Sequence, residues 1–152
     1  YHVPSGHTDG DAIIHFPLSN VIHMGDMFFN GLYPYVDLDA GGSLQGLVAA
    51  ADLALSLADE STRIIPGHGP FAVTEDLKNY RDYLVKASAN VQELIDKDMT
   101  LAQIIAAEPT RGWDEELGKT WITPPQFVTF IYNSLESIHR YTPPAKVETE
   151  TN

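Results

Sequence analysis

The chain has 152 residues with 21 acidic and 9 basic side chains, so its formal net charge is −12 at pH 7, and its 43% hydrophobic content suits one compact domain. A field this negative repels phosphate backbones and anionic lipid surfaces, which argues against nucleic acid and membranes as partners. Because the sequence has no cysteine, disulfides and thiolate metal sites are excluded, and a transition-metal site must use His, Asp or Glu.

The sequence shows no targeting signal for a cellular compartment. No apolar run approaches the roughly 18 residues of a membrane span, and residues 1–15 lack the basic and then apolar layout of a signal peptide. The chain opens on Tyr1 rather than Met, as though it started in mid-fold. We expect a soluble protein, cytoplasmic or periplasmic, and the compartment stays open.

Two short apolar runs near the N-terminus predict a β-hairpin. Residues 12–16 and 20–24 are separated by the tight-turn sequence Pro-Leu-Ser. The stretch 30–42 that follows is rich in Gly, Pro, Asp and Tyr, which is typical of a functional surface loop.

A helix and a buried strand are predicted next. Ser43 suits a helix N-cap, and apolar residues follow it at helical spacing until just before residue 59. Residues 62–66 have the pattern of a buried strand and run directly into a Gly-His-Gly-Pro turn. We therefore expect this strand to carry His68 at its tip.

The remainder of the chain is predicted to be helical. A long helix begins at Thr74 and ends near residue 97. Two capping-box patterns open further helices: Thr100 with Gln103, and Thr123 with Gln126. The tail 141–152 has no apolar periodicity, so we expect it to be disordered. Residues 1–140 are interpreted as one domain, or part of one, with a helical extension from about residue 74.

Three segments place a possible metal ligand beside glycine at a turn or a strand end. They are Gly6-His7-Thr8-Asp9-Gly10-Asp11, His23-Met24-Gly25-Asp26, and Gly67-His68-Gly69-Pro70. In this order and spacing they resemble the second half of the metallo-β-lactamase superfamily signature, over about residues 4–75. The resemblance implies an α/β fold that is half of a four-layer αββα sandwich, with one mixed or antiparallel sheet, flanking helices and a helical C-terminal region.

The resemblance also implies roles for three residues. His7 matches a ligand of the first zinc, Asp26 the carboxylate that bridges two metals, and His68 the last ligand of the second zinc. Imidazole and carboxylate groups suit Zn²⁺, of which a complete domain would hold two, with Fe or Mn as alternatives. Such a pair lowers the pKa of bound water to near neutrality, so a metal-bound hydroxide, and no side-chain base, would be the nucleophile.

One departure from the family pattern is large. The first half of the superfamily site is a His-x-His-x-Asp-His cluster, which this chain does not contain. We therefore expect weak or absent zinc occupancy in this chain alone. We also expect exposed apolar surface where the other half of the sandwich would pack, so the expected partners are a missing N-terminal half or a homodimer mate, besides a small-molecule substrate.

Other polar residues near these motifs are expected to be structural. His15 and His23 lie in predicted strands, and His139 lies near a helix C-terminus. Asp9 and Asp11 flank His7, where turn-forming carboxylates are the default and orientation of the His7 ring is the alternative.

The leading functional hypothesis is a di-zinc hydrolase acting on an ester, thioester, lactone or amide bond. Asp26 favours general hydrolysis over β-lactam hydrolysis, since the resemblance at that position is to glyoxalase II and lactonases. Tyr33 and Tyr35 are candidates for a substrate mouth, as is Phe29, with packing of their loop as the alternative. Two other hypotheses are a non-catalytic truncated fragment or dimerising half-domain, and a nuclease, which the net charge disfavours.

Overall fold

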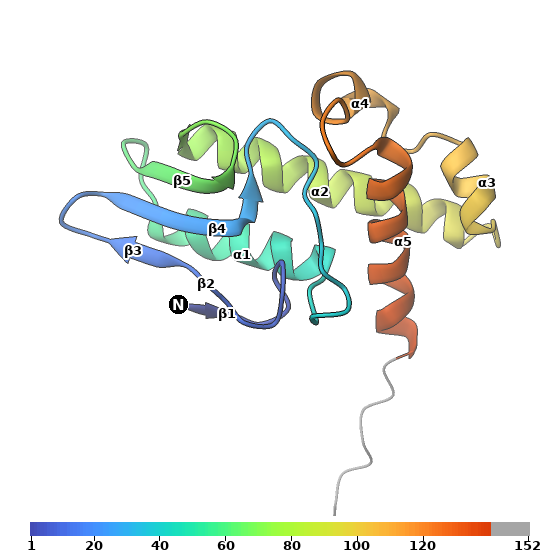
Figure 1. Ribbon diagram of the computed structural model, residues 1–152, viewed down its shortest axis with the longest axis horizontal. Coiled ribbons are helices and arrows are strands. Elements are labelled where there is room, and N and C mark those ends of the chain that lie inside the picture. Colours follow the sequence, from blue (N-terminus) through green and yellow to red (C-terminus); the bar gives the residue numbers. More distant parts are fainter. Residues whose placement is uncertain (141–152) are drawn as a thin grey trace, which may run out of the picture.

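The computed structural model describes residues 1–140 (Figure 1), so the tail 141–152, predicted to be disordered, lies outside the described residues. The elements in chain order are β1 His2–Val3, β2 Asp11–Ala12, β3 Ile14–Phe16, β4 Val21–Phe29, α1 Leu44–Leu57, β5 Arg63–His68, β6 Ala72–Val73, α2 Thr74–Ile95, α3 Leu101–Ala106, α4 Arg111–Leu117 and α5 Pro124–Arg140. The predicted hairpin is formed by β3 and β4, and both long helices begin within a residue of their predicted starts.

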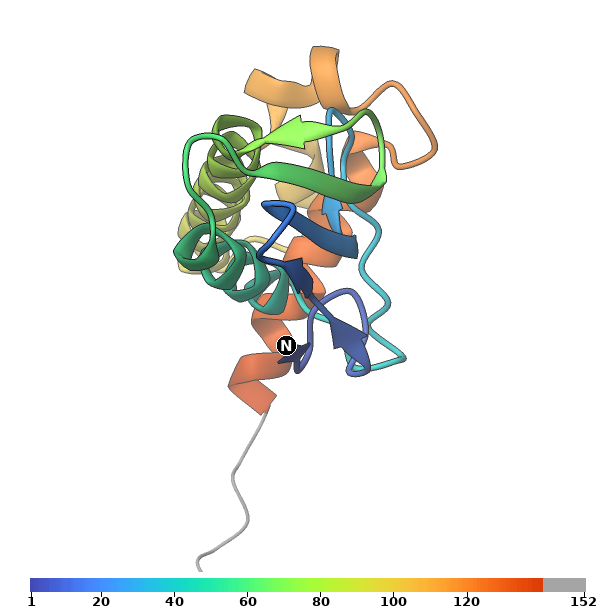
Figure 2. The same ribbon diagram turned by 90° about the vertical axis from the view of Figure 1, so that its left-hand side faces the viewer.

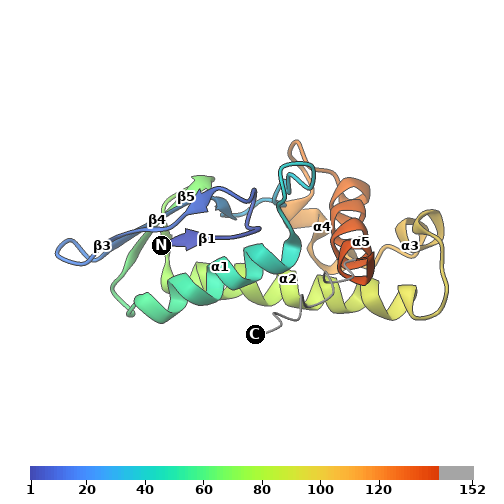
Figure 3. The same cartoon turned by 90° about the horizontal axis from the view of Figure 1, so that it is seen from below.

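The main sheet has four strands in the order β3-β4-β5-β6. Strands β4 and β5 are parallel and are connected through helix α1, whereas β3 and β6 pair antiparallel with their neighbours. Strands β1 and β2 form a separate two-stranded ribbon. The predicted α/β class with a mixed sheet is therefore confirmed. Helices α1 and α2 lie on one side of the sheet (Figures 2 and 3).

The two faces of the sheet differ in burial. On the helix side, Ile22 pairs with Ile64, which pairs with Ala72, and all three are buried. The register places the following residues on the opposite, open face: Ile14, Phe16, Val21, His23, Arg63, Ile65 and Val73. Three of its apolar side chains remain 49–52% exposed: Ile14, Phe16 and Val73. The expectation of an exposed apolar face is confirmed, because helices cover only one side.

Helix α1 begins at the predicted cap. The Ser43 Oγ accepts a hydrogen bond from the backbone N–H of Gly46 at 2.9 Å and donates one to the carbonyl of Ser5 at 2.9 Å. A second hydroxyl acts on the same helix end, because Ser134 of α5 accepts a buried hydrogen bond from the Leu44 N–H at 3.1 Å. The N-terminus of α1 is thus joined to the N-terminal loop and to the C-terminal helix.

The helical region packs on the sheet domain through α2 and α5. Helix α2 buries one face that includes Leu77, Leu84 and Val91. Helix α5 buries Phe127 and Ile131 in the same core. None of the helices within residues 1–140 combines the length and apolar content that crossing a membrane requires.

Candidate metal centre

Asp26 lies where strand β4 departs from regular pairing. His23 pairs with Ile65 and Phe29 pairs with His68, so six steps along β4 match three steps along β5. Bulges of this kind re-aim side chains next to functional sites. The irregularity directs the Asp26 carboxylate toward the end of β5, and its side chain remains 45% exposed.

His68 ends strand β5, as predicted. Its ring stacks on Phe29 with centroids 4.8 Å apart and planes 17° from parallel, and its carbonyl accepts a hydrogen bond from the Asn30 N–H at 2.9 Å. Gly67 precedes it because a β-carbon at that position would overlap Oδ1 of Asp26 and the backbone of Gly25. The absence of a side chain at residue 67 thus lets the carboxylate approach His68.

His7 comes from the loop between β1 and β2, which lies against the N-terminus of α1. The Ser43 N–H donates to the carbonyls of Ser5 and Gly6, and the Asp37 N–H donates to the carbonyl of His7. Gly46 permits this contact, since a β-carbon there would overlap the backbone of Ser5. A rigid helix end therefore positions a histidine that is nearly 20 residues away from Asp26 in sequence.

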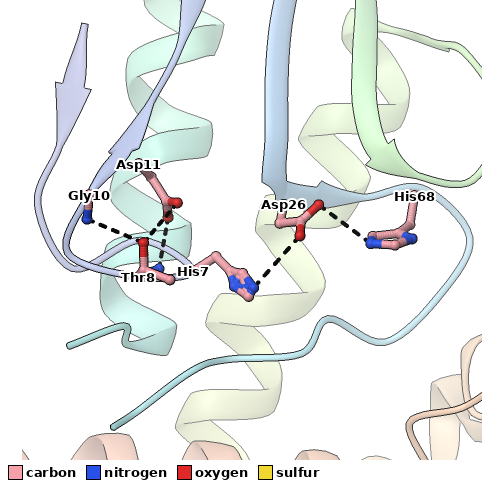
Figure 4. A network of polar contacts seen from close by, with 6 residues as sticks. All are labelled: His7, Thr8, Gly10, Asp11, Asp26 and His68. Atoms are coloured by element: carbon pink, nitrogen blue, oxygen red, sulfur yellow. Dashed lines mark hydrogen bonds and ion pairs between the residues drawn. The ribbon is translucent and has the colours of Figure 1, made fainter. Parts of the chain in front are cut away.

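The three predicted ligands converge (Figure 4). Nε2 of His7 lies 3.7 Å from Oδ2 of Asp26, and Nε2 of His68 lies 3.4 Å from Oδ1. The carboxylate therefore sits between two imidazoles and presents a different oxygen to each. Within residues 1–140, however, no group of three or more His, Cys, Asp or Glu side chains lies close enough together to hold a metal ion.

The donor atoms suit a zinc-like ion in chemistry, and one of the two His–Asp pairs suits it in spacing. Two ligands about 2.0–2.2 Å from a tetrahedral ion lie about 3.3–3.6 Å apart, and the His68 pair falls within that span while the His7 pair lies just beyond it. Nδ1 of His7 is buried and lacks a hydrogen-bond partner. Buried polar atoms usually have a hydrogen-bond partner. The other ring nitrogen of His7, Nε2, is the one that faces the carboxylate.

Tyr33 does not line a substrate mouth, so this prediction is wrong. Its side chain is fully buried, stacks on Phe127 at 4.2 Å and donates a hydrogen bond to Oδ1 of Asp114 at 2.7 Å. Burial and the neighbouring Asp114 carboxylate raise the pKa of the Tyr33 hydroxyl. The packing alternative for this loop applies to Tyr33, because helices α4 and α5 cover it.

Tyr35 and Phe29 do contact the predicted ligands. The Tyr35 ring meets the His7 ring edge-on at 5.5 Å, and Phe29 is buried beneath His68. Sequence reasoning missed Trp121, whose ring lies 4.9 Å from that of His68 at an angle of 61°. Its only local signal is a tryptophan in a short polar segment between helices.

The neighbouring polar residues have structural contacts. Asp11 accepts hydrogen bonds from the N–H and the hydroxyl of Thr8 at 2.9 and 3.1 Å, so its predicted turn-forming role is confirmed. His23 makes the local contact expected of it, since Nδ1 accepts from the Gly25 N–H at 3.1 Å. His15 is half-buried on edge strand β3. The side chain of His139 lies outside the described residues.

The fold matches solved structures. No protein-family model and no curated protein sequence matches the chain. A double mutant of the sec-alkyl sulfatase Pisa1 superposes with a TM-score of 0.69 and 16% identity, over 93% of this chain and 25% of that one. The sec-alkylsulfatase Pisa1 from Pseudomonas sp. gives a TM-score of 0.64 and 19% identity, over 86% and 23%. TTHA1623 in a di-iron-bound form is 32% identical over 49% of this chain and 36% of that one, with a TM-score of 0.42.

These matches establish the fold. The neighbouring structures are metallo-β-lactamase-fold proteins, and this chain folds as part of such a domain, as the resemblance of its motifs implied. The chain spans about a quarter of the length of the alkylsulfatase and about a third of TTHA1623. The alkylsulfatase match includes the helical region as well as the sheet, since it covers 93% of the chain.

Proposed function

We propose that this chain supplies one half of the di-metal site of a metallo-β-lactamase-type hydrolase. One observation carries the proposal: each oxygen of Asp26 faces the Nε2 atom of a different histidine, His7 on one side and His68 on the other. A carboxylate in that position suits a bridge between two cations, with one histidine on each. A segment that carries a His-x-His-x-Asp-His cluster would supply the remaining ligands.

The chemistry follows from the donor set. When bound, two zinc ions, or iron or manganese in their place, supply Lewis acidity and lower the pKa of coordinated water. The residues of this chain hold the proposed ligands in position. His7 is fixed by the backbone of the α1 N-terminus, His68 is stacked on Phe29, and Asp26 is aimed by the bulge in β4. Side chains held in this way need little reorganisation when the site fills.

The bond to be cleaved is an ester, thioester, lactone or amide. Glyoxalase II and lactonases, which the motif resembles at Asp26, favour thioester or lactone hydrolysis over β-lactam hydrolysis. A sulfate ester belongs in the same substrate panel because the alkylsulfatase shares the fold over 93% of the chain. Phosphodiesters of nucleic acid are disfavoured, since the net charge of −12 repels them.

The experiment is a zinc titration of the protein followed by equilibrium dialysis. We expect weak zinc binding. Asp26→Ala, His7→Ala and His68→Ala should each reduce the zinc affinity by about tenfold or more, because water replaces the lost protein ligand on the metal. His15→Ala is the matched control, since it removes a histidine from the far strand β3. Zinc binding that is the same in Asp26→Ala as in the unmodified protein would sink the proposal.

A second candidate function is assembly through the open face of the sheet. The observation that favours it is the exposure of Ile14, Phe16 and Val73 on one face. A face of this kind pairs with another half-domain or with a second copy of the chain. Light scattering tests whether the chain forms a homodimer. A monomer that binds little apolar dye would argue against any partner that covers this face. Identical halves would still lack the His-x-His-x-Asp-His ligands.

A further inference from the structure

Two aromatic side chains border the candidate metal centre from opposite ends. Trp121 contacts the ring of His68 at 4.9 Å, and Tyr35 contacts the ring of His7 at 5.5 Å. Asp26 lies between the two histidines (Figure 4), and each histidine contacts one of the two aromatic rings. Both remain accessible, with Trp121 54% exposed and Tyr35 37% exposed.

Both rings are connected to the helical region, Tyr35 by contact and Trp121 by its place in the chain. The Tyr35 ring meets Phe130 of α5 edge-on at 5.4 Å. Trp121 lies in the segment between α4 and α5 and tilts against Phe29 at 6.1 Å. The buried Phe29 therefore contacts both His68 and Trp121, so the position of the indole is tied to that of the proposed ligand.

The open face of the sheet does not account for the exposed tryptophan. The exposed apolar side chains on that face belong to β3 and β6, whereas Trp121 belongs to the segment that follows α4. The basic side chain closest to it in sequence, Lys119, is paired with Glu115 at 3.0 Å. All the ring contacts that His7 and His68 make within residues 1–140 are to aromatic side chains.

We propose that Trp121 and Tyr35 contact the substrate and select for molecules whose scissile bond carries an aromatic or other flat apolar group. The proposal rests on the proposed hydrolase function of the same site and adds the substrate class. Flat apolar groups stack on accessible indole and phenol rings.

The test uses nuclear magnetic resonance of the ¹⁵N-labelled, metal-free protein. The chain has two tryptophans, so it gives two indole N–H signals, which Trp113→Phe and Trp121→Phe assign. Phenyl acetate and ethyl acetate are the probes because they share an ester and differ in the aromatic group. We expect phenyl acetate to shift the Trp121 signal saturably, with the Trp113 signal unmoved and ethyl acetate without effect.

The variants separate an aromatic contact from a structural role. Trp121→Ala should weaken phenyl acetate binding about tenfold, judged by the backbone N–H signals of His7 and His68, whereas Trp121→Phe should stay within about threefold of the unmodified protein. Circular dichroism checks that both variants fold. Unchanged phenyl acetate binding in Trp121→Ala, or an equal response to both esters, would overturn the proposal.

Failure of this inference is distinguishable from failure of the hydrolase proposal. Zinc affinity is compared between the unmodified protein, Asp26→Ala and the control His15→Ala, so the metal centre is tested without a change at Trp121. Loss of aromatic selectivity with intact zinc binding therefore concerns Trp121 alone. An unaltered zinc affinity in Asp26→Ala would contradict the metal-centre proposal. The titration of the metal-free protein with the two esters would still test the aromatic contact.

Discussion

The carboxylate of Asp26 occupies the space that a side chain at Gly67 would fill, so strands β4 and β5 pack closely where the proposed ligands meet. Gly67→Ala should therefore displace Asp26 and destabilise the protein by about 1–3 kcal/mol, as overpacking does. It should also lower zinc affinity about tenfold. Urea unfolding and equilibrium dialysis measure the two effects.

Gly112 offers a matched control for that change. A β-carbon at Gly112 would point into open space, and the residue is in helix α4. Gly112→Ala should leave zinc binding unaltered and stabilise the protein by about 1 kcal/mol or less. Equal losses of stability in the two variants would show that the contact with Asp26 is not the cause.

The hydroxyl of Ser134 couples the C-terminal helix to the start of α1. Ser134→Ala removes the buried acceptor of the Leu44 N–H and should destabilise the protein by about 1–3 kcal/mol, because the donor is left without a partner. Ser137→Ala, on the exposed surface of the same helix, should change stability by no more than about 0.5 kcal/mol. Chemical denaturation compares them, and indistinguishable midpoints would contradict the role of Ser134.

Stability should fall at alkaline pH because buried tyrosines resist ionisation. Burial raises the pKa of Tyr33, Tyr80 and Tyr83 in the folded protein. An acid whose pKa is raised on folding stabilises the folded state below its unfolded pKa of about 10 and loses that contribution as pH rises further. Tyr80→Phe should reduce the slope of unfolding free energy above pH 10 by up to about 1.4 kcal/mol per pH unit. An identical slope in urea titrations from pH 8 to 11 would refute it.

Asp59 should make stability depend on pH in the acid range. Hydrogen bonds from the side chains of Asn20 and Ser61 lower the pKa of its carboxyl to about 2. A carboxyl with a depressed folded pKa stabilises the protein above its unfolded pKa and loses that contribution as pH falls toward the folded value. Asp59→Asn should flatten the fall in thermal midpoint between pH 4 and pH 2, whereas Glu60→Gln should not. Parallel plots of thermal midpoint against pH for the unmodified protein and both variants would contradict this role of Asp59.

The regular elements were predictable where their signals are local. Ser43 caps α1 as predicted, and Thr100 with Gln103 forms the capping box of α3, because both signals depend on residues three positions apart. Helix α4 and strands β1, β2 and β6 were missed. The strands have two residues each, and α4 starts at Arg111 after Thr110, whose side chain makes no cap hydrogen bond. These segments are too short or too weakly marked to show a periodic pattern of apolar residues.

The sequence by itself indicated the fold and the three proposed ligands, since each ligand lies beside glycine in a segment whose order and spacing resemble a known family. Tertiary structure alone decided the rest. It brought His7 to Asp26 through contacts of the α1 N-terminus, buried Tyr33 against helices distant in sequence, and placed Trp121 beside His68. These relationships depend on long-range packing, and packing between segments far apart in the chain leaves no local periodicity from which it could be inferred.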